Sequence, residues 1–146
     1  MADEADTSTD RPGVTERGEL SLALDGGEMV LRPTYEAIEG FEQTTGKGII
    51  QLAQESINSR LKLGEIAQIA CECIRAWGRE VDDKGAAGAN PKRIASLIQE
   101  SEGGLLMVNK TISVMLSLAV TGNYTAMGEM KAGTAMTTTS GLPAGN

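Results

Sequence analysis

The centre of the chain carries a helical pattern of apolar residues, which restricts the fold more than any other feature. Between about Gly64 and Trp77, apolar side chains recur at intervals of three, four, seven and eleven residues from the first one. This spacing places them on one face of an amphipathic helix. The face consists of Ile66, Ile69, Ala70, Cys73 and Trp77. Gly78 then provides a plausible helix stop.

Similar patterns predict four more helices. Pro33 suits the first position of one helix, and Asn90 before Pro91 is typical of the start of another. A third has its apolar stripe at Ile49, Ile50, Leu52, Ala53 and Ile57. The last is apolar on most sides, which indicates a central helix or one whose face awaits a partner. The five predicted helices cover about residues 33–45, 48–61, 64–77, 90–102 and 105–120.

A β-hairpin is expected before the first helix. Leu20, Leu22 and Leu24 alternate with small residues and lead into Asp25-Gly26-Gly27, a sequence typical of a tight turn. A lone hairpin is marginal in water, so its apolar face must dock on the helices. The fold class is therefore mainly α: an N-terminal β-hairpin followed by a bundle of about five helices, with disordered termini.

Composition divides the chain into three regions. Residues 1–17 are acidic, rich in Thr and Asp, and without periodicity, so they are predicted to be a disordered N-terminal tail. Residues 18–122 form the helical domain with its hairpin, and residues 82–89 within it are expected to be a flexible connection. Residues 123–146, rich in Gly, Thr, Ala and Met, are predicted to be a flexible C-terminal tail.

The charge of the chain restricts its partners. The formal net charge is −7. Nucleic-acid binding requires clustered Lys and Arg that neutralise phosphates, so no nucleic-acid partner is expected. Negative charge is also repelled by anionic membrane surfaces. Polar residues interrupt the apolar segment 105–120, whereas a membrane-spanning helix needs about 20 predominantly apolar residues, so no membrane contact is expected.

The sequence offers no recognisable catalytic or cofactor site. It contains no histidine, which excludes histidine-based catalysis and the usual zinc sites. Cys71 and Cys73 point to different sides of a helix and are expected to be buried free thiols. The Thr45-Gly46-Lys47 sequence lacks the flanking residues of a phosphate-binding loop. Three glutamates at positions 36, 39 and 42 are more simply a solvated helix face than paired catalytic carboxylates. We therefore expect no metal, no cofactor and no enzymatic activity.

Methionines are concentrated near the C-terminus and suggest a partner-binding surface. Flexible thioether side chains suit surfaces that adapt to apolar partners. The alternative is that Met107 and Met115 fill gaps in the core. The candidate partner-binding residues are Met107, Met115, Leu118, Met127 and Met130.

Several ordered segments resemble a family of small tail proteins. The segments are residues 18–26 (GELSLALDG), 31–39 (LRPTYEAIE), 45–53 (TGKGIIQLA) and 64–69 (GEIAQI). This series is similar to proteins encoded in the tail gene clusters of gene transfer agents and related phages or prophages. The resemblance covers roughly residues 18–122. Members of that family are described as tail assembly chaperones or as tail tube proteins, and they supply no catalytic residues.

The resemblance implies two alternative functions. A tail assembly chaperone would bind the tape-measure protein in the cytoplasm of the bacterial host and help the tail tube protein to polymerise around it. A structural tail tube component would instead remain in the virion tail. Because a β-barrel needs many alternating segments, the helical pattern favours the chaperone. The sequence leaves open whether the chain forms a homo-oligomer.

Overall fold

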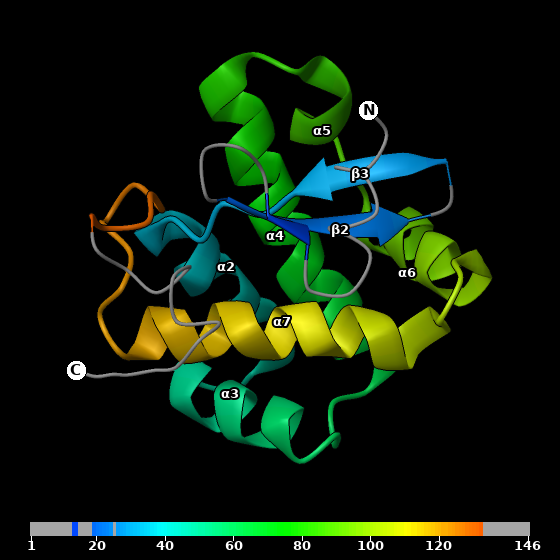
Figure 1. The fold of residues 1–146 in the computed structure, drawn as a ribbon, viewed down its shortest axis with the longest axis horizontal. Coiled ribbons are helices and arrows are strands. Elements are labelled where there is room, and N and C mark those ends of the chain that lie inside the picture. The colour runs from blue at the N-terminus through cyan, green and yellow to red at the C-terminus, as the bar shows by residue number, and fades with distance from the viewer. Residues whose placement is uncertain (1–12, 15–18, 25, 133–146) are drawn as a thin grey trace, which may run out of the picture.

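A computed structural model describes residues 13–14, 19–24 and 26–132 of the 146-residue chain. This part contains a three-stranded sheet followed by six helices (Figure 1), which confirms the predicted mainly α fold with an N-terminal hairpin. The elements are β1 (Gly13–Val14), β2 (Leu20–Leu24), β3 (Gly27–Val30), α2 (Tyr35–Thr45), α3 (Ile49–Ile57), α4 (Leu63–Val81), α5 (Lys84–Ala87), α6 (Pro91–Glu100) and α7 (Gly104–Val120).

The sheet has the order β1-β2-β3, and both pairings are antiparallel. The β2–β3 register joins Leu24 to Gly27, so the tight turn lies where the sequence predicts it. Gly26 has a φ of 93°, a backbone conformation that glycine adopts at no steric cost. The leucines of β2 are buried against the helices, as a docked hairpin requires. Apart from residues 13–14, the predicted disordered segment 1–17 lies outside the described residues.

The core is built around α4. This helix packs against α2, α5 and α6, while α7 runs across it and packs on α3 (Figure 1). Ile66, Ile69 and Cys73 are fully buried, which confirms the predicted apolar face. Trp77, which was expected on the same face, lies toward the C-terminal end of α4 and is only half-buried. The helix does not end at Gly78 as predicted but continues to Val81.

Gly78 has a packing role instead of a terminating one. A Cβ atom at this position would collide with the backbone of Ala86 and Ala87 in α5. The connection predicted to be flexible, residues 82–89, therefore contains a short helix that lies directly on α4. Only a residue without a side chain allows this close approach.

Two other helix boundaries differ from the sequence prediction. Thr34, rather than Pro33, starts α2: it is the N-cap, and its Oγ1 accepts a hydrogen bond from Ala37 N at 2.9 Å. Helix α3 ends at Ile57, four residues before the predicted end at Leu61. By contrast, the Asn90 side chain caps α6 as predicted, accepting from Lys92 N and Arg93 N.

Residues 121–132 fold back onto the start of α2, although a flexible tail was predicted from residue 123. Tyr35 N donates to Ala126 O at 2.9 Å, and Tyr124 and Met130 form an isolated β-bridge. Arg32 is buried and donates from Nε to Met127 O at 2.9 Å. The rest of the predicted tail, residues 133–146, lies outside the described residues.

Candidate functional site

The two helices α3 and α7 lie side by side and enclose a surface groove of about 670 Å³, which we call the α3–α7 groove. Its floor and walls come from the last turn of α3, the following residues, and the first half of α7. The lining residues are Ser56, Ile57, Ser59, Gly103, Leu106, Met107, Asn109, Lys110, Ser113 and Val114.

A buried polar pair fixes the two helices relative to each other. Ser56 Oγ donates to Asn109 Oδ1 at 2.9 Å, and Asn109 Nδ2 donates to the Ser56 carbonyl at 3.0 Å. Both residues are buried. Because an unpaired buried amide costs more than a paired one gains, the pair selects one register of α3 on α7. The groove is therefore a preformed feature.

The surface around the groove exposes large apolar side chains. Leu106 is 70% exposed, Met107 52% and Ile57 61%. Ile50 is 64% exposed and lies two helical turns before Ile57, so both occupy the same side of α3. The expected buried stripe of α3 was therefore wrong at Ile50 and Ile57, while Ser56 is buried instead.

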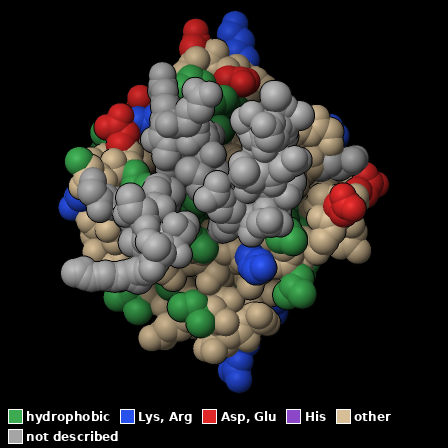
Figure 2. Space-filling model, viewed as in Figure 1, with side chains coloured by type: hydrophobic (Ala, Val, Ile, Leu, Met, Phe, Trp, Pro, Cys, Tyr) green, Lys and Arg blue, Asp and Glu red, His purple; other side chains and the backbone are tan. Residues whose placement is uncertain are grey.

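The charged part of the groove lining is basic. Lys110 is the charged residue among those that line it. Figure 2 shows hydrophobic side chains in the lower part of the face that carries α7 and α3, whereas the visible acidic side chains lie higher in that view. An apolar surface with a basic residue at its edge suits an apolar partner that carries a carboxylate.

The predicted partner-binding residues do not form one surface. Met107 lies in the α3–α7 groove, at the first turn of α7. Met127, 47% exposed, and the half-buried Met130 belong to the loop after α7, and Leu118 packs partly against the core near that end. Met115 is fully buried, with its sulfur 3.6 Å from Cys73 Sγ. Met115 therefore fills the core, as the alternative interpretation had it, and is not available on the surface.

Comparison with known families matches residues 17–122 to the family described as "Phage tail tube protein, GTA-gp10". The chain belongs to this family. It is thus a phage tail protein of the gene-transfer-agent type, and proteins of this kind interact with other tail proteins. No curated protein and no solved structure matches the chain. The matched segment includes the whole α3–α7 groove but ends before the loop at residues 123–132.

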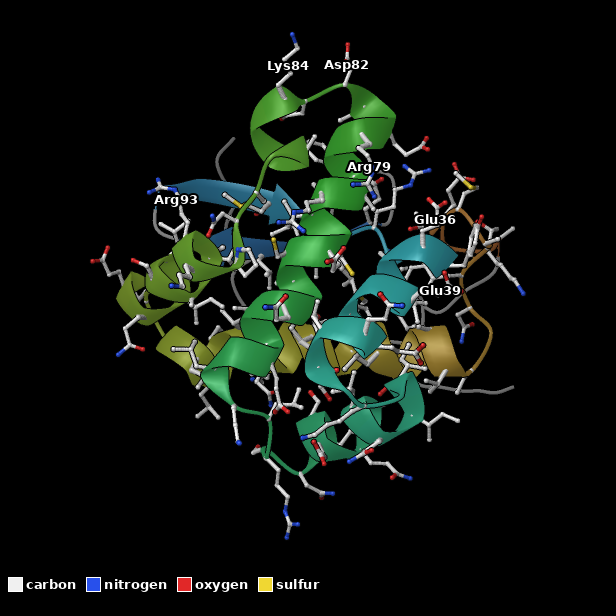
Figure 3. The ribbon with its side chains drawn as sticks, turned by 180° about the vertical axis from the view of Figure 1, so that it is seen from behind. Glu36, Glu39, Arg79, Asp82, Lys84 and Arg93 are labelled. Atoms are coloured by element: carbon white, nitrogen blue, oxygen red, sulfur yellow. The ribbon has the colours of Figure 1, made fainter. Side chains whose placement is uncertain are left out.

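The tail family is generally non-enzymatic. Burial raises the pKa of both the Cys71 and Cys73 thiols, which keeps them protonated and unreactive. No cluster of three or more potential metal-binding side chains is present in the described residues. Glu36 and Glu39 point outward from α2 and are exposed (Figure 3).

Lys47 of the tail protein is engaged by two carboxylates. Its Nζ lies 2.8 Å from Glu55 Oε1 and 2.6 Å from Glu65 Oε2. Hydrogen bonds to Glu55 and Glu65 raise the pKa of Lys47. The preceding Gly46 is the left-handed C-cap of α2. The Thr45-Gly46-Lys47 sequence is therefore a helix end tied to α3 and α4, not a phosphate-binding loop.

Within the described residues, no single helix is long and apolar enough to cross a membrane. Helices α6 and α7 reach that length and composition only when taken together, across a bend of 119°.

Proposed function

We propose that this tail protein is a tail assembly chaperone, which binds the tape-measure protein through the α3–α7 groove and helps the tail tube to polymerise. The observation that carries the proposal is the exposed apolar surface formed by Ile57, Leu106 and Met107 on a preformed groove. Large exposed apolar side chains that cluster around a groove are typical of a protein-binding surface. Binding of this kind would take place in the cytoplasm of the bacterial host during assembly.

The groove suits an amphipathic helix of the partner. A helix laid into a groove contacts it through apolar residues spaced three or four apart. Fully burying one side chain such as Leu106 contributes about 1.5–3 kcal/mol, and micromolar binding needs about 8 kcal/mol. Because lost translational and rotational freedom offsets part of this gain, a few such side chains and a carboxylate of the partner facing Lys110 support weak, reversible binding. Reversibility is what a chaperone requires, because the tube must later replace it.

A binding assay with one charge-introducing variant tests this proposal. Leu106→Glu should weaken binding to fragments of the tape-measure protein from the same tail gene cluster at least tenfold, measured by isothermal titration calorimetry. The matched control is Val81→Glu, since Val81 is 40% exposed at the end of α4 and lies outside the groove. Equal affinities of the two variants, at unchanged melting temperature, would place the binding site elsewhere.

A structural tail tube component is the second candidate, and the description of the family favours it. The described residues hold only one sheet, of three short strands, whereas a β-barrel subunit needs many strands. Mass spectrometry of purified mature particles separates the two functions. A chaperone should be absent while tube and tape-measure peptides are abundant. A copy number that matches the tube would refute the chaperone.

A further inference from the structure

Within the described residues, the outer edge of the sheet is formed by β3, and this edge has no partner strand there. In the register of β2 and β3, Leu31 N donates to Leu20 O at 2.9 Å, so the odd-numbered residues of this segment turn their N–H and C=O groups toward β2. The even-numbered residues then face away from β2. Arg32 follows this rule, since its N–H donates to Cys73 O in α4. Glu28 and Val30 also face outward, and neither has a backbone hydrogen bond to another element in the described part of the chain.

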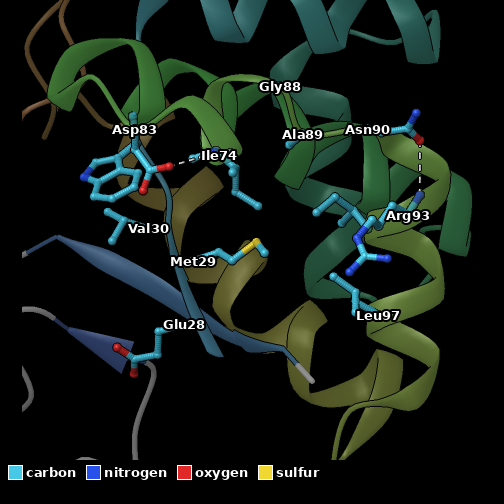
Figure 4. A pocket seen from close by; sticks show the side chains of 14 residues that line it. Glu28, Met29, Val30, Ile74, Asp83, Gly88, Ala89, Asn90, Arg93 and Leu97 are labelled. Atoms are coloured by element: carbon cyan, nitrogen blue, oxygen red, sulfur yellow. Dashed lines mark hydrogen bonds between the residues drawn. The ribbon is translucent and has the colours of Figure 1, made fainter. Parts of the chain in front are cut away.

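This edge borders a second surface groove, which we call the β3 groove (Figure 4). It has a volume of about 390 Å³ and lies between β3 on one side and α5 and α6 on the other, with α4 beneath. Its apolar lining includes Met29, Ile74, Trp77, Ala86, Ile94 and Leu97. An apolar groove beside unpaired strand groups offers both side-chain pockets and a hydrogen-bonding edge.

We propose that the β3 groove binds an extended segment of a partner protein, which adds a strand to the sheet beside β3. The backbone of the segment pairs with the outward groups of Glu28 and Val30. Every second side chain then points to the same side as Met29 and enters the groove. The intervening side chains lie beside Glu28 and Val30. This site is separate from the α3–α7 groove and does not depend on the function proposed for it.

Charge defines the partner further. The Glu28 side chain is exposed and forms no ion pair within the described residues. A residue directly opposite it on an added strand lies within about 5 Å, where opposite charges stabilise the pair. Arg93, on the α6 wall, likewise has no carboxylate partner in the part of the chain described. The segment therefore alternates apolar residues with polar ones, and it carries a Lys or Arg opposite Glu28.

A second copy of this chain fits the groove less well than a single segment does. The wall formed by α5 and α6 stands along the free side of β3 (Figure 4). A second copy would bring the same wall beside its own β3, so the two walls would meet before the strands could pair. A single extended segment has no such wall and needs only the width of one strand, about 4.8 Å.

Trp77 gives this site its own spectroscopic signal, because it is the one tryptophan of the chain and it lines the β3 groove. The probes are overlapping peptides of about 12 residues from the tube and tape-measure proteins of the same tail gene cluster, long enough to cover β3 at roughly 3.3 Å per residue. At least one peptide with the alternating pattern should shift the Trp77 fluorescence. The same peptide should slow hydrogen exchange of the Glu28 and Val30 amides about tenfold.

Two variants test the mode of binding. Val30→Pro removes an outward N–H without touching the bonds to β2 and should weaken peptide binding at least fivefold, as the loss of one hydrogen bond predicts. Glu28→Lys should weaken it similarly and does not alter the backbone, so it remains informative if Val30→Pro fails to fold. The matched control is Glu39→Lys on the exposed face of α2, which should bind normally.

Three results would overturn the proposal. One is that no peptide protects the Glu28 and Val30 amides. Another is that a bound peptide protects only residues of α3 and α7, which would assign it to the other groove. The third is that the two amides are already protected in the free protein in a concentration-dependent manner, which would identify a second copy as the occupant.

Discussion

Helices α3 and α4 are both amphipathic, but α4 buries most of its apolar face whereas α3 buries only part of it. Ile66, Ile69 and Ile74 of α4 are enclosed by neighbouring elements on several sides. Helix α3 packs mainly on α7, so Leu52 and Ala53 are buried while Ile50 and Ile57 remain exposed. The difference shows that the same kind of apolar pattern is buried where neighbours surround the helix and stays partly exposed where they do not.

The largest expected effect breaks the buried side of this comparison. Ile69→Ala should lower the free energy of unfolding by about 2–5 kcal/mol, because it leaves a cavity in a fully enclosed part of the core. Chemical denaturation monitored by circular dichroism measures the change. The control is the same substitution on α3, Ile57→Ala, which should change stability by no more than about 0.5 kcal/mol. A similar loss in both variants would mean that α3 is as enclosed as α4.

A smaller effect is expected at the contact that holds α3 in place. Asn109→Ala removes both hydrogen bonds to Ser56 and leaves the Ser56 hydroxyl buried without its partner, at a cost of about 1–3 kcal/mol. Hydrogen exchange should increase in α3 more than in α4, because α4 has other neighbours. An equal increase in hydrogen exchange in both helices would show that α3 does not open independently of α4.

The smallest effect concerns the ion pairs by which Lys47 joins α3 to α4. Hydrogen bonds from Lys47 and Gln51 lower the pKa of Glu55. For Glu65, burial raises the pKa, but hydrogen bonds from Lys47 and Lys62 N outweigh this effect and lower it. A carboxylate whose pKa is lower in the folded state stabilises the fold at pH values above its unfolded pKa of about 4.5. This stabilisation is lost as the pH falls through the lower pKa of the folded state.

Lys47→Met should therefore lower the melting temperature slightly at pH 7, and the difference from the unmodified protein should shrink at pH 3. Lys84→Met is the control, because Lys84 is exposed on α5 and forms no ion pair among the described residues (Figure 3). A difference in melting temperature that stays constant between the two pH values would show that the stabilisation by Lys47 does not depend on ionised Glu55 and Glu65.

The sequence predicted those parts of the fold that local signals specify. The hairpin turn at Gly26, the cap at Asn90 and the apolar face of α4 all depend on residues close together in the chain. Gly78 was wrongly predicted to end the helix. It is a glycine because α5 packs directly against it, and no local sequence pattern distinguishes such a contact from a helix stop. The fold of residues 121–132 depends on Arg32, which lies 95 residues before Met127.

The candidate site was predicted only in part for a similar reason. Met107 was identified from its side-chain type, and it lies in the α3–α7 groove. Helix α7 is apolar on most sides, so periodicity alone could not separate the buried Met115 from the exposed Leu106. Exposure on such a helix depends on which neighbours cover each side, and only the three-dimensional structure shows this.

The contacts of Arg32 set the length of chain that this domain needs. Its guanidinium lies 3.2 Å from Glu129 Oε2, 3.7 Å from Glu19 Oε2 and 4.0 Å from Glu80 Oε1, in addition to the bond with the Met127 carbonyl. A recombinant fragment truncated at the end of the family match, residue 122, would lose two of these four partners, Met127 and Glu129. A fragment made for expression or crystallisation should therefore extend to at least residue 132.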